Sequence, residues 1–175
     1  MTIPNVTQFA SKDPVMERFD LLTNELGAKI AKRIYNVAVL IEKSPLPKTT
    51  QDLVMLRASQ INGCGFCVDY HTKDAAVAGE SATRIHLVAA WRESTVFSEA
   101  ERAALALAEE GTRLADGHHG VSDETWAEVR KHYDDDQTVA LVSLVAMINA
   151  NNRLNVIVRK PGGSYEPGMF AGMAN

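Results

Sequence analysis

The chain has 175 residues, of which 46% are hydrophobic and 23% are charged, and its formal net charge is −4. This composition is typical of one globular domain, and a chain of this length buries roughly 70% of the surface that its unfolded form exposes. Such a chain needs no disulfide or metal ion to hold its fold. The acidic balance and the lack of a basic tract argue against a nucleic-acid partner.

Membrane and export segments are not expected. The longest apolar run, residues 139–148, is shorter than the roughly 18–20 residues of a membrane span. Residues 1–14 contain no basic segment followed by an apolar one, which is the pattern of a secretory signal. We therefore expect a cytoplasmic protein with no membrane contact. In that reducing compartment two cysteines rarely cross-link a fold, so we expect Cys64 and Cys67 to have a chemical role.

The first half of the chain predicts five helices, because its apolar residues recur with a helical period. The first begins at Asp13-Pro14, an N-cap followed by proline, and ends near Gly27. The others are expected over residues 28–43, 51–61 and 64–78, and briefly after Ser81. Thr49 or Thr50 can cap the third of these helices. Proline and glycine at the junctions end each one.

The second half predicts three more helices. Ser98 and Glu101 form a capping box for a helix that reaches about residue 115, and Ser122 caps the next. The last and most apolar helix covers residues 136–158. No segment alternates with the period of a strand, so the sequence predicts a single all-α domain over residues 1–175. Its tail is irregular from about residue 159, and Tyr165 and Phe170 in this tail are expected to pack against a neighbouring subunit.

Four polar residues interrupt the last helix, namely Asn149, Asn152, Arg153 and Asn155. A buried amide without a partner costs about 1–3 kcal/mol, so partners are expected. These residues could line a site or bond across a subunit interface. We favour a structural network of hydrogen bonds.

Cys64, Cys67 and His71 lie three and four residues apart, which places them on one stripe of a helix. Two thiols one turn apart at a helix N-terminus can form a disulfide or stay open with little change in the backbone. The helix dipole and its free N–H groups lower the pKa of a thiol from its ordinary value near 8.5. His71 could accept the proton of Cys67 or hold a water molecule. These are the parts of a redox dithiol.

The cysteine pair fits three alternative roles less well. Free cysteines are often small buried hydrophobic residues, but the spacing from His71 argues for chemistry. A structural zinc site needs four ligands, and the only other close histidines, His118 and His119, are adjacent. A thioredoxin motif would follow a strand, whereas both flanks here are helical. We therefore expect no metal and no cofactor.

The residues around the cysteines resemble a known family. The segments 53–67 and 70–75 look like the core of the AhpD-like alkylhydroperoxidases, of the carboxymuconolactone decarboxylase superfamily. Further likeness covers residues 79–81, 87–94, 97–105 and 148–155, so that the resemblance extends in order over residues 30–158. It implies an all-α helical bundle that assembles as a trimer or hexamer.

The resemblance also implies roles for the site residues. Cys67 would be the thiolate that attacks a peroxide and becomes a sulfenic acid, Cys64 the thiol that resolves it to a disulfide, and His71 the base. The family has a glutamate twelve positions before the first cysteine, where this chain has the shorter Asp52. Asp52 could join a proton relay with His71, or it could cap its own helix. Some members carry histidine between the cysteines, where this chain has Phe66.

Three functions follow as hypotheses. The first is a thiol-dependent hydroperoxide reductase that acts on organic or hydrogen peroxide and is recycled by a dithiol reductant, for which the family suggests a lipoyl-bearing protein. The second, motivated by Asp52 and Phe66, is a dithiol–disulfide exchange adaptor or redox sensor with little peroxidase activity. The third is a lactone-acid decarboxylase, as elsewhere in the superfamily, although those relatives do not depend on paired cysteines.

Overall fold

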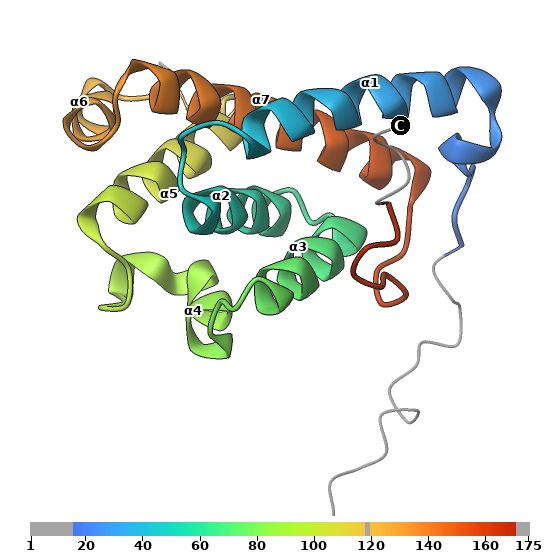
Figure 1. Cartoon of the computed structure of the whole chain (residues 1–175), viewed down its shortest axis with the longest axis horizontal. Coiled ribbons are helices and arrows are strands. Elements are labelled where there is room, and N and C mark those ends of the chain that lie inside the picture. Colours follow the sequence, from blue (N-terminus) through green and yellow to red (C-terminus); the bar gives the residue numbers. More distant parts are fainter. Residues whose placement is uncertain (1–15, 118–119, 171–175) are drawn as a thin grey trace, which may run out of the picture.

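The computed structural model describes residues 16–117 and 120–170, and within these ranges every regular element is a helix (Figure 1). In chain order the elements are the 3₁₀ turn η2 (Leu21–Thr23), α1 (Glu25–Glu42), α2 (Lys48–Ile61), α3 (Gly65–Val77), α4 (Ala82–Leu87), the 3₁₀ helix η3 (Val88–Glu93), α5 (Glu99–Thr112), α6 (Asp123–His132) and α7 (Asp135–Val158). The predicted all-α fold is confirmed for this part of the chain.

Side-chain caps begin several of the helices where the sequence predicts them. Ser81 and Ser122 accept hydrogen bonds from the first turns of α4 and α6. Ser98 and Glu101 form the predicted capping box of α5. The structure differs at α2, which begins at Lys48 after Pro47, so that neither Thr49 nor Thr50 caps it. Pro47 is the N-cap residue of α2 and its side chain makes no capping hydrogen bond. Proline is tolerated at a helix start because it has no backbone N–H that would be left without a partner there.

The helix predicted to end near Gly27 was wrong over its described part, because residues 16–24 contain only the turn η2 and α1 begins at Glu25, before Gly27. Asp13 and Pro14, the predicted start of the preceding helix, lie outside the described residues. Asn24 caps α1 by accepting hydrogen bonds from Leu26 and Gly27, so Gly27 lies in the first turn of this helix. A Cβ atom at Gly27 would collide with the carbonyl oxygen of Leu21. Glycine therefore permits the turn before α1 to fold back onto the helix, and it does not end a helix here.

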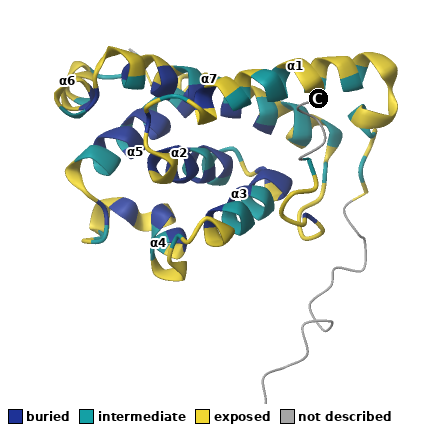
Figure 2. Cartoon of the chain, in the orientation of Figure 1, coloured by how far each residue is buried: buried dark blue, intermediate teal, exposed yellow. Residues whose placement is uncertain are grey.

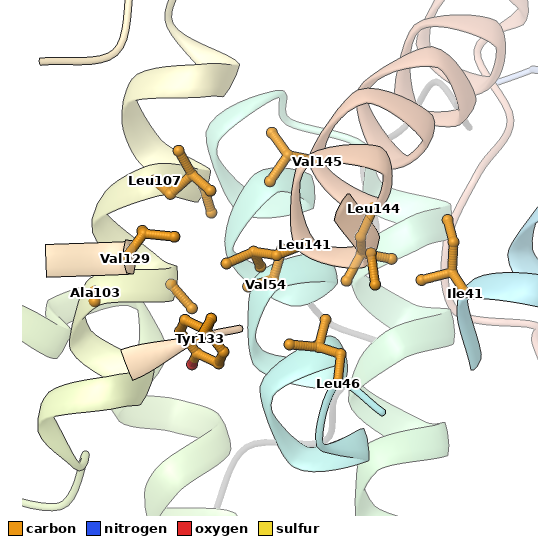
Figure 3. Packing of buried hydrophobic residues seen from close by; sticks show 13 residues of the cluster. Ile41, Leu46, Val54, Ala103, Leu107, Val129, Tyr133, Leu141, Leu144 and Val145 are labelled. Atoms are coloured by element: carbon orange, nitrogen blue, oxygen red, sulfur yellow. The ribbon is translucent and has the colours of Figure 1, made fainter. Parts of the chain in front are cut away.

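Helix α2 lies at the centre of the bundle, between α3, α5 and α7 (Figure 1). Buried residues are concentrated on α2 and on the sides of the other helices that face it (Figure 2). One hydrophobic cluster joins α2, α5, α6 and α7 through Val54, Leu107, Val129 and Leu141 (Figure 3). A second cluster joins α2 to α3, α4, η3 and α5. Together they fix the position of α3, which carries both cysteines.

A buried ionic cluster links α2, η3 and α5 away from the cysteines. The Glu109 carboxylate accepts hydrogen bonds from Arg57 Nε at 2.8 Å, Trp91 Nε1 at 2.9 Å and Arg92 Nη2 at 3.0 Å. Burial by itself would raise the pKa of Glu109, but the hydrogen bonds from Trp91 and Arg57 hold this pKa below its ordinary value. The carboxylate is therefore charged and fully partnered.

Helix α7 is the single described helix whose length and composition would suffice to cross a membrane. The core helix of a water-exposed bundle satisfies the same criterion. Here α7 packs against α1, α2 and α5, and its buried Asn149 and Asn152 form hydrogen bonds within the chain. One side of α7 therefore packs into the bundle, and the asparagines on it belong to the site.

Candidate functional site

Cys64 and Cys67 form a disulfide at the start of α3, with their Cα atoms 5.3 Å apart. Gly63 turns the chain after α2 with a φ of +65°, a conformation that favours glycine. Cys64 is the N-cap of α3, and the Cys67 N–H donates to Cys64 Sγ at 3.3 Å. One N–H group of the helix N-terminus, that of Cys67, therefore points at the Cys64 sulfur.

The two cysteines have different surroundings although both are buried, with 1% of Cys64 and 3% of Cys67 exposed. Cys67 lines a cavity of about 560 Å³ between α1, α2, α3 and α7. Cys64 does not line this cavity, and both cysteines pack in a cluster with Phe66 and Tyr165. A small molecule in the cavity would therefore meet Cys67, the residue for which the family resemblance implies the attacking role.

Apolar side chains form most of the cavity wall. They include Ile34 and Val39 of α1 and Met147 of α7. The polar groups that line it include Lys48, Asp52, His71 and Asn155. An apolar cleft with a few converging polar groups is typical of a small-molecule site.

His71 lies on α3 one turn after Cys67, as predicted, and is 8% exposed. Its ring packs against Tyr70, with 4.7 Å between the ring centroids. Burial, reinforced by the positive charge of Lys48, lowers the pKa of His71 from 6.5 to about 3. Within the described residues its ring nitrogens have no hydrogen-bond partner. His71 is therefore neutral near pH 7 and able to accept a proton from a ligand or from Cys67.

Asp52 lies in the same cavity but is paired with another residue. Its carboxylate forms an ion pair with Lys48, one turn earlier on α2. Burial raises the pKa of Asp52, and the contact with Lys48 partly offsets this. Asp52 does not cap α2, whose N-cap is Pro47, so that expectation was wrong. A relay from Asp52 to His71 stays a prediction, because no hydrogen bond joins them in the described chain.

The asparagines of α7 form the expected network with the junction between α2 and α3. Asn62, the C-cap of α2, donates through Nδ2 to Asn149 Oδ1 and to Asn152 Oδ1, both at 2.9 Å. Asn152 in turn donates to Ser59 Oγ at 3.1 Å. These bonds hold the segment just before Cys64, so the structural interpretation of Asn149 and Asn152 is confirmed.

Asn155 has a different partner from the other asparagines. Its Nδ2 donates to Cys67 Sγ at 3.4 Å, across 88 positions of sequence. The sequence placed Asn155 in the structural network and missed this contact. Its spacing of three residues from Asn152 is the signal that could have found it, because both then share one face of the helix.

Residues 160–170, here called the C-terminal strap, lie over the start of α3. Tyr165 is 2% exposed and packs against Phe66, Tyr70 and Phe170. The prediction that Tyr165 packs against a neighbouring subunit was wrong, because α3 of the same chain already covers it. Phe170 is only partly buried, so its packing against a neighbouring subunit stays a prediction. The strap thereby shields Cys64 from solvent.

Polar contacts fix the C-terminal strap to α3. Asp69 Oδ2 accepts from the backbone N–H groups of Gly163 at 2.7 Å and of Tyr165 at 3.0 Å. Lys73 Nζ donates to the Tyr165 carbonyl at 2.6 Å, and the Tyr165 hydroxyl donates to Asp74 at 2.8 Å. Burial is the first influence on Asp69, but its hydrogen bonds from Lys73 and the strap lower its pKa, so it holds the strap as a carboxylate.

The histidines that could have joined the cysteine pair in a zinc site belong to the loop after α5. His118 and His119 lie outside the described residues. In the rest of the chain, over residues 16–117 and 120–170, no group of three His, Cys, Asp or Glu residues could hold a metal ion.

Comparisons with known proteins identify the same core. Residues 30–110 match the carboxymuconolactone decarboxylase family. The uncharacterized protein YdfG of Bacillus subtilis (strain 168) is 38% identical over 132 residues, which cover 75% of this chain and 88% of that protein. A protein of unknown function from Agrobacterium tumefaciens, described as a putative antioxidant defence protein AhpD, has 31% identity and a TM-score of 0.79. That match covers 86% of this chain and all of the other.

The fold is also shared with the debrominase Bmp8, at a TM-score of 0.71 and 20% identity, over 82% of this chain and 76% of that one. At this identity the likeness concerns the fold alone. The matches to YdfG and to the Agrobacterium protein cover nearly the whole of those chains, and the matched family segment contains both cysteines. The chain therefore belongs to the carboxymuconolactone decarboxylase family as an AhpD-like protein, and its Cys64–Cys67 pair is compatible with redox chemistry.

Proposed function

We propose that this protein is a thiol-dependent hydroperoxide reductase. The observation that carries the proposal is the position of Cys67, which faces an apolar cavity while its partner Cys64 lies within disulfide distance behind it. Such a pair supplies one sulfur that reacts with a ligand and a second that resolves the product. His71, neutral and one turn away, supplies a base beside the reacting sulfur.

The reaction proceeds in two steps on the protein. The Cys67 thiolate attacks the terminal oxygen of ROOH, the O–O bond breaks, and Cys67 becomes a sulfenic acid while the alkoxide takes up a proton as ROH. The Cys64 thiol then attacks the sulfenic sulfur, and the disulfide forms as water leaves with the thiol proton. An external dithiol restores both thiols and becomes a disulfide itself.

His71 moves one proton in this scheme. It takes the proton of the Cys67 thiol and returns it to the departing alkoxide, so the imidazole ends the step as it began. Because the pKa of His71 is lowered to about 3, it is a weak base. The thiolate therefore needs stabilising contacts besides His71.

The cavity supports an organic hydroperoxide as substrate and a slender dithiol as reductant. Its wall is mainly apolar, which suits an alkyl or aryl group. Cys64 and Cys67 are only 1% and 3% exposed, and Cys67 lines the cavity, so a rigid protein surface reaches neither sulfur easily. A lipoyl arm is long and narrow, and a lipoyl-bearing protein in the cytoplasm is the reductant we propose.

The test is consumption of cumene hydroperoxide with dihydrolipoamide as the sole reductant. We expect turnover in the wild type, none in Cys67→Ser, and a single sulfenic acid, trapped by dimedone, in Cys64→Ser. His71→Asn should slow turnover, whereas His86→Asn on the exposed side of α4 serves as its control. Unchanged turnover in Cys67→Ser would refute the proposal.

The second candidate is a dithiol–disulfide exchange adaptor. The pairing of Asp52 with Lys48 favours it, because that pairing leaves His71 without the carboxylate partner that a peroxide-activating relay would use. Rapid disulfide exchange with dihydrolipoamide, together with no peroxide consumption, would select this function. Activity on a lactone acid after both cysteines are changed to serine would select the decarboxylase instead. Bromide release from 2,3,4-tribromopyrrole, the ligand seen with a Bmp8 variant, would select a debrominase.

We also propose that the protein is a homo-oligomer, a trimer or hexamer. Support comes from α1, which exposes a row of large apolar side chains. They are Leu26, Ile30, Val37 and Leu40. Light scattering on the purified protein gives the subunit count directly, and a monomeric mass at micromolar concentration would contradict the proposal.

A further inference from the structure

Three asparagines of α7 follow one another at intervals of three residues and all contact the α2–α3 region. Asn149 and Asn152 bind Asn62, just before the first cysteine, and so hold the backbone in place. Asn155 is the next member of the row and reaches the sulfur of Cys67 itself. The structural network thus extends directly to the reacting atom.

We propose that Asn155 stabilises the thiolate of Cys67, and that it thereby sets the acidity of this thiol and the ease with which the disulfide is reduced. The inference rests on the proposed function in one respect, since it takes Cys67 as the reacting thiol. It adds a residue from α7, remote in sequence, to the cysteines and histidine of α3.

Asn155 can favour the thiolate because the Cys67 sulfur becomes a stronger hydrogen-bond acceptor when it is reduced and ionised. A disulfide sulfur is a weak hydrogen-bond acceptor, whereas a thiolate carries a full charge and accepts strongly. The Nδ2–Sγ contact of 3.4 Å therefore gains strength when Cys67 is reduced and ionised. A contact that favours the reduced, ionised form lowers the thiol pKa and makes the disulfide easier to reduce.

Each sulfur has its own donor. The Cys67 backbone N–H at the start of α3 donates to Cys64 Sγ, and the Asn155 amide donates to Cys67 Sγ. With 3% of Cys67 exposed, bulk water can contribute little to this sulfur. In water, a thiolate is stabilised by hydrogen bonds from water molecules. The amide of Asn155 donates such a hydrogen bond to the buried Cys67 sulfur instead.

Other charged and titratable groups also face the cavity that Cys67 lines. They are Glu17 before α1, Tyr35 and Glu42 from α1, Lys48 and Asp52 from α2, Tyr70, His71 and Asp74 from α3, and Lys160 from the C-terminal strap. A substitution of Asn155 leaves all of them in place. Its effect on the Cys67 thiol can therefore be separated from theirs.

The experiment measures the pKa of the Cys67 thiol without any peroxide. In a Cys64→Ser background, the rate of iodoacetamide alkylation is followed against pH for Asn155→Leu, Asn155→Asp and a control, Asn151→Leu. Asn151 lies on the same helix and lines the same cavity. We expect Asn155→Leu to raise the thiol pKa by about one unit, because a hydrogen bond to a charged group is lost. Asn155→Asp keeps the shape of the side chain and should raise it further, since a carboxylate repels the thiolate.

A second readout uses the chain with both cysteines. The equilibrium of its disulfide with glutathione should shift toward the disulfide by about tenfold in Asn155→Leu, which corresponds to one unit of thiol pKa. Asn151→Leu should leave this equilibrium unchanged. Circular dichroism confirms folding, and if Asn155→Leu does not fold, the isosteric Asn155→Asp carries the test.

The outcomes separate this inference from the proposed function. An unchanged thiol pKa in both Asn155 variants, or an equal shift in Asn151→Leu, overturns the inference even if the wild type consumes peroxide. A raised thiol pKa and a shifted glutathione equilibrium support it even if peroxide turnover is absent, in which case the proposed reductase activity alone fails.

Discussion

Two buried polar regions of this protein are built in opposite ways. The Glu109 cluster brings one carboxylate together with Arg57, Trp91 and Arg92, and each partner meets it at hydrogen-bond distance. The cysteine region instead buries a neutral imidazole, that of His71, whose pKa is lowered to about 3 and whose ring nitrogens, within the described chain, have no hydrogen-bond partner. Helix α2 contributes to both regions, with Arg57 in the first and Asp52 in the second.

The difference separates a structural role from a chemical one. A charge whose partners are all in place stabilises one arrangement and has no capacity left for a ligand. A buried base without a partner costs stability, but it can accept a proton at the moment of reaction. We therefore expect changes in the first region to alter stability and changes in the second to alter reactivity and pH dependence.

The strongest effect should be on stability at the ionic cluster. Glu109→Gln leaves Arg57 charged and buried without its carboxylate, which should lower the free energy of unfolding by about 3–5 kcal/mol. Urea denaturation measures it, with Glu99→Gln on the exposed first turn of the same helix as the control. Disulfide formation between the cysteines should persist in the folded variant. A loss below about 1 kcal/mol, the typical value for an exposed pair, would show that the cluster is not structural.

The second-largest expected effect is the contribution of His71 to the pH dependence of the free energy of unfolding. The pKa of His71 is about 3 in the folded chain and near 6.5 when unfolded, so its contribution to stability is complete above pH 6.5 and is lost as the pH falls. Between pH 6.5 and 5 this loss amounts to about 2 kcal/mol, at 1.36 kcal/mol per unit. His71→Asn should remove that part of the pH dependence of unfolding. Equal slopes in the two proteins over this range would contradict the assignment.

A smaller effect is expected from loosening the C-terminal strap. A Cβ atom at Gly162 would collide with the carbonyl of Gly65 at the start of α3, so Gly162→Ala must displace the strap. We expect a cost of about 1–3 kcal/mol and faster reduction of the disulfide by dithiothreitol, because Cys64 loses its cover. Ser164→Ala, two residues further along the strap, is the control. Unchanged reduction kinetics in Gly162→Ala would mean that the strap does not limit access.

The smallest expected effect is that of the Lys48 charge on the pKa of His71. Lys48→Met removes the cation that helps to lower the pKa of His71, so this pKa should rise, by less than about one unit because burial is the larger cause. Titration of the His71 ring by NMR measures the shift, with Lys29→Met on α1 as the control. A pKa that stays constant would leave burial as the sole cause.

Much of the local structure could be predicted from the sequence. The caps at Ser81, Ser98 and Ser122 were correct because each depends on hydrogen bonds over three residues. The placement of Cys67 and His71 one turn apart on one helix was correct for the same reason, since helical geometry alone aligns these positions. The family resemblance likewise rested on this continuous segment.

Contacts between distant segments could not be predicted, and they complete the site. Residue 27 is glycine because the carbonyl of Leu21, before α1, lies against it and leaves no room for a Cβ atom. Tyr165 is buried because α3 offers Asp69 and Asp74 as anchors. The sequence gives the identity of each residue, but it does not give the residue from a distant segment that packs against it in the folded chain.

The surroundings of the Cys67 sulfur also depend on contacts between distant segments, which the sequence does not reveal. The helical class, most helix starts and the grouping of two cysteines with a histidine could be inferred from the chain, because they follow from interactions within a few residues. Only the folded arrangement shows that Cys67 opens into the cavity and that an amide 88 positions away reaches its sulfur. The packing of α7 against α2 and α3 brings that amide to the sulfur. The spacing of Asn155 from Asn152 places both on one face of the helix, but it does not identify the sulfur as the partner.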